Sequence, residues 1–344
     1  MRTHAPTALA ATTLAIALAA CGSSAKNAGS SLGSAAGAKS STSASAAPKT
    51  STTVGHGSGP TLNVGDQAGD GAQALLTAAG LLNKLPFPVK FADFTSGPPI
   101  LQAESSGSID IAQVGDAPPV FAASGGADIQ LVSQVVNGPA ASAILASKAS
   151  KITSPSQLKG KRIAVTQGSS ADYFLLDLLQ KNHLTVHDVT LDYLQPAAAT
   201  AALQSGSVDA WATWSPYIEQ ASANGAKVIA DGSKYGSNYA YQVASKAAIT
   251  NPAKAKEIKQ YLAIVNKAHI WANSHPAAWG ALWAKSTGLP AKVTIKGAKD
   301  DWEKPQPISG QTATAEQGLV SAFYKAGLIP QNYSFKKYVS TAFN

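Results

Sequence analysis

Short apolar segments alternate with helical segments from Thr61 to Ala247, a pattern that leaves few folds open to the chain. The clearest unit lies between Lys161 and Leu179. Arg162 to Val165 is a β-branched and apolar run, which is typical of a buried parallel strand. A polar turn ends this strand, and from Ala171 apolar residues recur at helical spacing. The alternation predicts an α/β fold with parallel sheets that carry helices on both faces.

The polar turn Gln167-Gly168-Ser169-Ser170 is a candidate anion site. It lies at the carboxyl end of the predicted strand and at the start of the predicted helix, where Ser169 or Ser170 suits the N-cap position. A helix start offers free backbone N–H groups and the positive end of the helix dipole. The turn therefore predicts a seat for a small anion. An ordinary capped turn is the alternative on this stretch alone.

Polar turns of this kind follow several of the predicted strands. They lie near Gln67, Ser96, Asp116 and Ser169, and a fifth lies near Trp214. In open parallel sheets, ligands bind outside the carboxyl ends of the strands. We therefore expect several of these turns to meet at one cleft.

The other elements that we expect follow from the same patterns. The strands are expected over residues 62–64, 89–94, 109–114, 129–136, 143–146, 162–165, 189–194, 208–213, 228–230 and 241–245. The helices are expected over residues 72–82, 100–106, 197–204, 253–273, 277–287 and 313–326, with others starting at Ala117, Ala171 and Pro216.

Composition restricts how an anion could be held. The 344 residues carry a net charge of +8, and the first 60 residues hold four basic residues and no acid. Arginine occurs only at Arg2 and Arg162. A bound anion would thus depend on neutral donors and helix dipoles. Basic runs interleaved with aromatic residues are absent from the sequence, which argues against nucleic acid as a partner, and its histidines show no spacing for a metal site.

The N-terminal segment predicts export and lipid attachment. Residues 1–20 hold an apolar run that is typical of a secretory signal and too short for a stable membrane span. The end of this segment and the two residues after it read Leu18-Ala19-Ala20-Cys21-Gly22, which resembles the bacterial lipobox. Cys21 is the only cysteine in the sequence. We expect a lipid on Cys21 to hold the protein on the extracytoplasmic face of the cell membrane. Residues 21–60 are rich in Gly, Ala, Ser and Thr and predict a flexible tether.

Four motifs carry a family resemblance. GDAPPVFAASGGAD (115–128), LKGKRIAVTQGSSADY (158–173), LQSGSVDAWATWSPY (203–217) and KSTGLP (285–290) resemble aliphatic sulfonate-binding proteins of ABC importers. The resemblance implies a type II periplasmic-binding-protein fold, with two doubly wound lobes joined by two crossover strands. The first lobe would span residues 61–145 and 243–344, and the second would span residues 146–242.

The resemblance also implies ligand-binding residues. Asp66 and Asp172 depart from the family pattern, and each would place a carboxylate near the anion. Tyr241, at the returning crossover, either lines the cleft or packs at the hinge. Trp211 and Trp214 either contact the ligand or belong to the core, and Asp116 either contacts it or caps its own helix. The candidate ligand-binding residues are Gln67, Gly97, Pro98, Asp116, Ala117, Ser169, Ser170, Ala171, Trp211, Trp214 and Tyr241.

Other polar and aromatic residues have plainer interpretations. His269 is expected at the surface, as are the other histidines of the ordered region. Asp300, Asp301 and Glu303 are expected to be solvated. Trp271, Trp279 and Trp283 lie at helical spacing, which favours the core of the C-terminal helices.

The sequence thus predicts a monomeric receptor that captures a small organosulfonate and delivers it to ABC permease subunits. The alternative cargoes are taurine, nitrate, a sulfate ester or a pyrimidine precursor of thiamine. The fold family also includes pyrimidine-forming enzymes of thiamine synthesis. We expect no enzyme and no cofactor, because the chain lacks a convincing Ser–His–Asp set and a second cysteine.

Overall fold

The computed structural model describes residues 53–67 and 71–344. The chain divides into two units, Met1–Ala44 and Ser45–Asn344, and the described residues belong to the second. The predicted signal at 1–20, Cys21 and residues 21–52 of the predicted tether lie outside the described residues. Within the described ranges, no helix is both long and apolar enough to cross a membrane.

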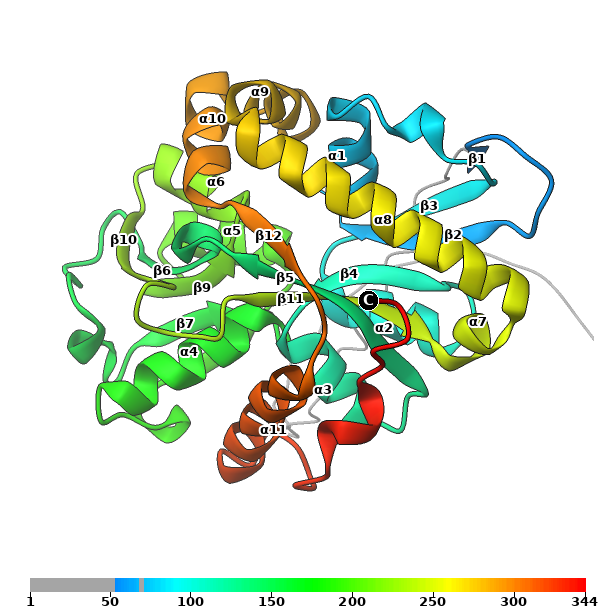
Figure 1. The fold of residues 1–344 in the computed structure, drawn as a ribbon. Coiled ribbons are helices and arrows are strands. Elements are labelled where there is room, and N and C mark those ends of the chain that lie inside the picture. The colour runs from blue at the N-terminus through cyan, green and yellow to red at the C-terminus, as the bar shows by residue number, and fades with distance from the viewer. Residues whose placement is uncertain (1–52, 68–70) are drawn as a thin grey trace, which may run out of the picture. The chain divides into compact units, whose positions relative to one another are not determined.

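The strands of the described region form two sheets (Figure 1). The first sheet has the order β1-β3-β2-β4-β11-β5-β12, and the second has the order β10-β6-β9-β7-β8. We call the first sheet with its helices the first lobe, and the second sheet with its helices the second lobe. The strands are β1 (Thr53–Val54), β2 (Leu62–Gln67), β3 (Val89–Phe94), β4 (Ile111–Gly115), β5 (Ile129–Asn137), β6 (Ser142–Ala146), β7 (Arg162–Val165), β8 (Thr190–Tyr193), β9 (Ala210–Trp214), β10 (Lys227–Asp231), β11 (Tyr239–Ser245) and β12 (Glu303–Gln306).

The helices lie on the faces and ends of these sheets (Figure 1). The α-helices are α1 (Ala72–Ala78), α2 (Gly97–Ser105), α3 (Ala117–Ser124), α4 (Ser170–Lys181), α5 (Pro196–Ser205), α6 (Tyr217–Ala223), α7 (Lys246–Thr250), α8 (Pro252–Ser274), α9 (Pro276–Thr287), α10 (Ala291–Asp300) and α11 (Gly310–Lys325). Short 3₁₀ turns are η1 (Leu82–Lys84), η2 (Pro139–Ala141), η3 (Pro155–Leu158), η4 (Val186–Asp188) and η5 (Phe335–Tyr338).

Both sheets are mixed, so the expectation of parallel sheets holds for only some of their strands. β2 pairs in parallel with β3 and β4, but β11 runs antiparallel to both β4 and β5. In the second sheet β7 is parallel to β8 and β9, whereas β6 is antiparallel to β9 and β10. The reason is that β6 and β11 are the strands by which the chain enters each sheet from the other one. Strand–helix alternation predicts the direction of successive strands within a sheet but not of an entering strand.

The chain changes sheets earlier than the sequence indicated. Because β6 belongs to the second sheet and β11 to the first, the crossings lie at residues 138–141 and 232–238. The predicted lobe boundaries near Leu145 and Gln242 were therefore placed inside strands. The crossing segments are short: the first joins β5 to β6, and the second joins β10, an edge strand of the second sheet, to β11.

Order also begins before Thr61, where the predicted tether was expected to end. Thr53 pairs with Lys90 and Val54 with Val89, so this short segment forms an antiparallel edge strand on β3. Backbone hydrogen bonds make such a pairing without a large apolar side chain, which is why composition did not reveal it.

The β7–α4 unit folds as its pattern predicts. Ile163, Ala164 and Val165 are buried in the second sheet. Phe174, Leu175 and Leu178 of α4 are buried and belong to the same hydrophobic cluster as Ile163 and Val165. Packing of this helical face against the sheet fixes where the helix begins, and so it fixes the position of the polar turn that precedes it.

The C-terminal region contains two elements that the patterns did not reveal. α10 follows α9 closely, and Thr294 Oγ1 donates a hydrogen bond to the Gly280 carbonyl at 2.6 Å. β12 pairs antiparallel with β5. The sequence of β12, Glu-Lys-Pro-Gln, has no apolar alternation, because the strand lies at the edge of the first sheet.

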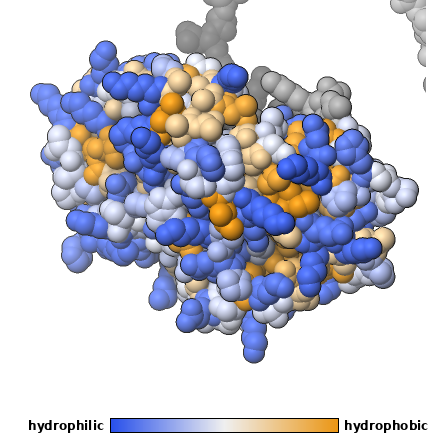
Figure 2. All heavy atoms as spheres, turned by 45° about the horizontal axis from the view of Figure 1, so that its top comes forward, coloured by the Kyte–Doolittle hydropathy of each residue, from blue (hydrophilic) through white to orange (hydrophobic). Residues whose placement is uncertain are grey.

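The face formed by the C-terminal helices shows no single large apolar patch. Figure 2 shows hydrophilic side chains over most of this face, with separate hydrophobic groups between them. Scattered apolar groups of this kind are normal on a protein surface.

Candidate functional site

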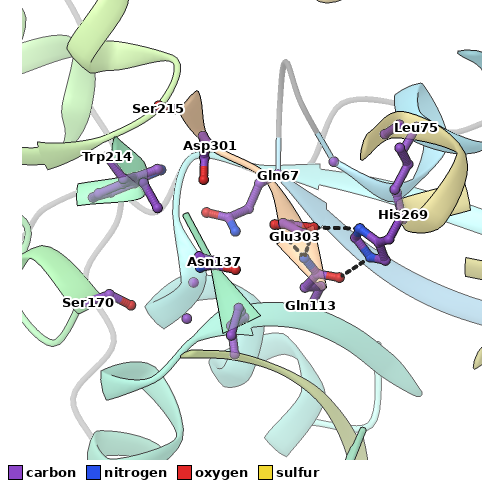
Figure 3. A pocket seen from close by; sticks show the side chains of 18 of the residues that line it. Gln67, Leu75, Gln113, Asn137, Ser170, Trp214, Ser215, His269, Asp301 and Glu303 are labelled. Atoms are coloured by element: carbon purple, nitrogen blue, oxygen red, sulfur yellow. Dashed lines mark hydrogen bonds and ion pairs between the residues drawn. The ribbon is translucent and has the colours of Figure 1, made fainter. Parts of the chain in front are cut away.

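A cavity of about 150 Å³ is lined by elements of both lobes. Residues at the ends of β2, β4 and β5, the start of α4 and the end of β9 contribute to its wall, and Figure 3 shows their side chains meeting there. Its lining residues are Asp66, Gln67, Gly71, Ala72, Leu75, Gly97, Gln113, Val114, Gly115, Pro118, Asn137, Ala141, Ser142, Ser169, Ser170, Trp214, Ser215, Ala240, His269, Ala272, Asn273, Trp279, Trp283, Ala298, Asp301 and Glu303.

The structure brings five of the candidate residues together at this cavity. Gln67, Gly97, Ser169, Ser170 and Trp214 all line it. They come from both lobes, and each lies at a strand end, a helix start or the turn between them. The turns near the carboxyl ends of the strands therefore do meet at one cleft, as expected for this class of sheet.

The remaining candidate residues do not line the cavity. Trp211 is fully buried on the face of β9 opposite to Trp214, because side chains two or four apart share a face of a strand and those three apart do not. Tyr241 is fully buried in the core of the first lobe. The others that lie outside the cavity lining are Pro98, Asp116, Ala117 and Ala171.

The start of α4 has backbone donors without a helical partner, next to Ser170 in the cavity wall. Gly168 has a φ of +71°, a conformation that favours glycine, and this turns the chain into the helix. Ser169 precedes the helix, but its Oγ donates to the Thr166 carbonyl at 2.7 Å. Ser170 is the first helical residue and lines the cavity, and its hydroxyl also interacts with the Asp116 carboxyl. The N–H groups of Ser170 and Ala171 have no carbonyl partner within α4 because they are in its first turn. We call these two N–H groups and the Ser170 hydroxyl the α4 seat.

Asp172 points to the turn that precedes α4 and is not part of the cavity lining. Its carboxylate accepts a hydrogen bond from the Gly168 N–H at 2.9 Å. Burial raises the pKa of Asp172 to about 7, and the Gly168 N–H opposes that rise. The departure from the family pattern at this position therefore stabilises the turn.

Other helix starts near the cavity are already occupied by carboxylates of the protein. Asp66 accepts hydrogen bonds from the N–H groups of Ala72 (2.6 Å) and Gln73 (3.0 Å), which begin α1. Asp116 accepts one from the N–H of Ala117 (2.8 Å), which begins α3. The start of α2 is Gly-Pro-Pro, and proline has no N–H to offer. Of these four helix starts, α4 is thus the one that is best able to bind an external anion.

The first lobe contributes a polar network that sequence reasoning missed. His269 is only 3% exposed, so its expected place at the surface was wrong. Its Nδ1 lies 2.6 Å from the Glu303 carboxylate, and its Nε2 lies 3.1 Å from Gln113 Oε1. Gln113 Nε2 in turn donates to Glu303, and Gln242 Nε2 donates to Gln113 Oε1 at 2.8 Å. Figure 3 shows this network on one side of the cavity.

The network holds the Glu303 carboxylate in place. Gln113 directs its amide nitrogen toward Glu303 and its Oε1 toward His269 Nε2, while Nδ1 of His269 faces the Glu303 carboxylate. Burial opposes the charge on Glu303, but its interactions with His269 and Gln113 hold the pKa of this carboxyl below its usual range. Glu303 is therefore engaged in a network and is not the solvated residue that the sequence indicated.

A signal for this network was present in the sequence. Gln113 and Gln242 are polar residues inside strands that are otherwise apolar, and a buried amide requires a partner. Trp279 and Trp283 line the cavity as well as packing between helices, so the core interpretation of them was incomplete. Asp301 also lines the cavity.

The rims of the two lobes touch beside the cavity. Thr95 and Ser96 of the first lobe donate hydrogen bonds to Gln195 Oε1 of the second lobe at 3.1 and 3.0 Å. Phe121 of α3 lies against the Gly168 turn. The described conformation is therefore one in which the lobes are in contact around the cavity.

Asp66, which lines the cavity, and Asp116, which interacts with Ser170, predict a pH-dependent affinity for anions. Burial raises the pKa of Asp66 to about 7, and backbone donors at the start of α1 oppose this rise. Burial likewise raises the pKa of Asp116 to about 6, and the Ser237 and Ser170 hydroxyls oppose it. An anion that stays ionised binds better once these groups are protonated, so affinity is expected to rise as pH falls from 8 to 5, by roughly threefold or more. Calorimetric titration at several pH values measures this, and Asp116→Asn should flatten the profile. A steeper profile in the variant would contradict the explanation.

Comparisons with known proteins agree with the geometry. A family model described as NMT1/THI5 like matches residues 99–278. An aliphatic sulfonates-binding protein of Escherichia coli (strain K12) is 33% identical over 286 residues, which cover 80% of this chain and 87% of the relative. One of Bacillus subtilis (strain 168) is 30% identical over 259 residues, which cover 74% and 77%.

A solved structure agrees over nearly its whole length. The alkanesulfonate-binding protein SsuA from Xanthomonas axonopodis pv. citri bound to MOPS is similar with a TM-score of 0.73 and 30% identity, covering 83% of this chain and 99% of that chain. The desulfurization enzyme DSZB, at 17% identity and a TM-score of 0.55, shares the fold alone. The two-lobed fold that the resemblance implied is confirmed, with mixed sheets. The chain belongs to the NMT1/THI5-like family and, within it, to the aliphatic sulfonate-binding proteins.

Proposed function

We propose that this protein is the extracytoplasmic substrate-binding receptor of an ABC importer and that it captures a small organosulfonate between its lobes. The observation that carries the proposal is the α4 seat, which opens on a cavity between the two lobes of a sulfonate-binding family member. The seat offers two backbone N–H groups, a hydroxyl and the positive end of a helix dipole, which together suit an oxyanion. Gln67 and Ser142 line the same cavity and add neutral donors.

The proposal extends to delivery and location. Closing of the lobes around the ligand would be the change that permease subunits recognise. Relatives include a taurine-binding periplasmic protein of Escherichia coli (strain K12), which supports a location outside the cytoplasm. A lipid on Cys21 would hold the receptor on the outer face of the cell membrane, and residues 22–52 would give it reach.

A ligand panel tests the cargo. Thermal-shift measurements with alkyl and aryl sulfonates, taurine, sulfate and nitrate should show the largest rise in melting temperature with a sulfonate, because a ligand that binds only the folded state stabilises it. If nitrate or a pyrimidine raised the melting temperature and no sulfonate did, the proposed function would be wrong.

A pair of serine variants tests the α4 seat. Ser170→Ala is expected to weaken sulfonate binding at least tenfold, about 1.4 kcal/mol, because it removes a cavity-lining hydroxyl that now interacts with Asp116 and that we propose turns to the bound sulfonate. Ser169→Ala is the matched control, since the Ser169 hydroxyl is engaged with the Thr166 carbonyl and its loss should mainly lower stability. Calorimetric titration measures both. Equal affinity in Ser170→Ala and the unmodified protein would remove this hydroxyl from the site.

A further inference from the structure

Another contact between the lobes lies beside the cavity, where α6 of the second lobe meets α10 of the first. Figure 1 shows the two helices next to each other, and the hydrogen bond from Thr294 to the Gly280 carbonyl holds α10 on α9. A Cβ at Gly297 of α10 would lie 2.8 Å from Glu219 Oε1 of α6. The Glu219 carboxylate therefore rests against the backbone of the opposite lobe.

One oxygen of the Glu219 carboxylate lacks a donor. Its Oε1 accepts a hydrogen bond from the Ser215 hydroxyl at 3.2 Å, whereas its Oε2 is buried and has no hydrogen-bond partner within the described protein. Burial raises the pKa of Glu219, and the Ser215 hydroxyl and the positive charge of Lys296 oppose this rise. A buried acceptor without a donor destabilises the conformation that holds it, so a donor at Oε2 would strengthen this contact.

Lys296 is a cation that is placed to supply this donor. It precedes Gly297 in α10, so it lies one residue from the backbone that Glu219 touches. Its ammonium is paired with Asp300 in the next turn of the same helix, and the side chains of Lys296 and Asp300 are 80% and 43% exposed. An ion pair between exposed side chains contributes little to stability. Lys296 can therefore leave Asp300 when a buried carboxylate comes within reach.

The cavity borders this contact from both lobes. Ser215, which donates to Glu219, lines the cavity from the second lobe. Ala298, which follows Gly297, lines it from the first lobe. A ligand that draws these two walls together also draws Glu219 toward Lys296. An interaction that is stronger in the ligand-bound state adds to affinity even though neither residue touches the ligand.

We propose that Lys296 exchanges Asp300 for Glu219 when the ligand binds, so that an ion pair between α10 and α6 holds the lobes closed. This inference rests on the proposed function and adds Glu219 and Lys296 to it as positioning residues. The exchange gives the two carboxylates opposite effects on affinity. Glu219 strengthens binding because it pairs with Lys296 in the bound state, and Asp300 weakens binding because it competes for the same lysine in the free state.

Glu219→Gln tests the ion pair, since glutamine keeps an acceptor for Ser215 but loses the charge. Calorimetric titration of the full chain near pH 8, with butane-1-sulfonate and MOPS as probes, should show at least fivefold weaker binding, and stopped-flow measurements should show faster dissociation. Removing a negative charge beside the cavity would by itself favour an anion, so the expected effect is opposite to the simple charge effect. Equal or tighter binding in the folded variant overturns this inference and leaves the proposed function standing. If the unmodified protein binds neither sulfonate, the proposed function itself fails.

Lys296→Met tests the other partner. It should weaken binding to a similar extent, and Glu219→Gln should have no further effect in that background. Lys299→Met is the matched control, because it removes an exposed lysine from the same helix, and its affinity should stay within twofold. Lys296 is exposed, so this variant keeps the test open if Glu219→Gln does not fold. Effects of Glu219→Gln and Lys296→Met that simply add would show that the two residues do not pair.

Asp300→Asn tests the exchange itself. It should bind both probes at least twofold more tightly, because it frees Lys296 in the ligand-free protein. In the Lys296→Met background the same change should have no effect, which separates lost competition from a general gain in anion affinity. A role for Asp300 in stability alone would lower the melting temperature without tightening binding. Unchanged or weaker binding, or an equal gain in both backgrounds, would overturn the exchange.

Discussion

Adding one methyl group at Gly280 is expected to lower the free energy of unfolding by about 3 kcal/mol, at the upper end of the usual cost of overpacking. A Cβ at this position would lie 2.5 Å from Ile295 Cα and 2.7 Å from Ile295 N, so it would meet the backbone of α10 rather than a side chain that could move. Helices α9 and α10 would have to separate, and the hydrogen bond from Thr294 to the Gly280 carbonyl would be strained. Denaturant unfolding of Gly280→Ala measures the loss.

Gly318→Ala is the control for that experiment. Gly318 also lies inside a helix, α11, but a Cβ there would meet nothing within 4 Å. In that setting alanine is expected to stabilise the protein by about 0.5–1 kcal/mol, because glycine loses more backbone freedom on folding. The two glycine-to-alanine changes should thus have opposite signs. A stabilising Gly280→Ala would show that α10 does not pack on α9 as closely as described.

Replacing Ser170 with aspartate is expected to weaken sulfonate binding at least a hundredfold, about 2.7 kcal/mol. The change places a negative charge at the α4 seat, where the ligand's own negative charge is proposed to lie. Two like charges about 4 Å apart at an effective dielectric constant of 20 repel by about 4 kcal/mol, so the expected loss exceeds that of Ser170→Ala. Titration with the best sulfonate from the ligand panel measures the effect.

Ser207→Asp controls for the added charge. Ser207 lies on the same lobe as Ser170 but is exposed and outside the cavity, so its variant has the same net charge and should bind as the unmodified protein does. Melting temperatures of both variants without ligand show whether they are folded. Sulfonate binding that survives in a folded Ser170→Asp protein would mean that the anion is held elsewhere.

Much of the fold could be predicted because its elements are locally encoded. The β7–α4 unit illustrates this: its strand is a continuous apolar run, its helix has one apolar stripe, and a glycine and two serines mark the turn. β12 and α10 were not predicted because their positions depend on contacts with β5 and α9, which lie far away in the sequence. Strand direction was predicted wrongly for β6 and β11 for the same reason, since the partner lobe determines where each enters.

The candidate site was predicted where a turn joined a strand to a helix, and missed where a side chain came from a helix interior. Gln67 and Ser170 belong to the first kind. His269 lies in the middle of α8 and reaches the cavity only because β12 brings Glu303 next to it. Trp211 was offered together with Trp214 because both belong to one motif, but strand alternation places them on opposite faces. No periodicity within α8 distinguishes a buried histidine with a partner from an exposed one.

The carboxylates that cap α1 and α3 have a consequence for selectivity. Asp66 and Asp116 occupy the positive ends of α1 and α3. A doubly charged oxyanion would need these ends in addition to the start of α4. A dianion would gain little from the single vacant end, and each of its charges would be repelled by the capping groups once they ionise. We therefore expect the protein to bind inorganic sulfate more weakly than a monoanionic headgroup of nearly the same shape.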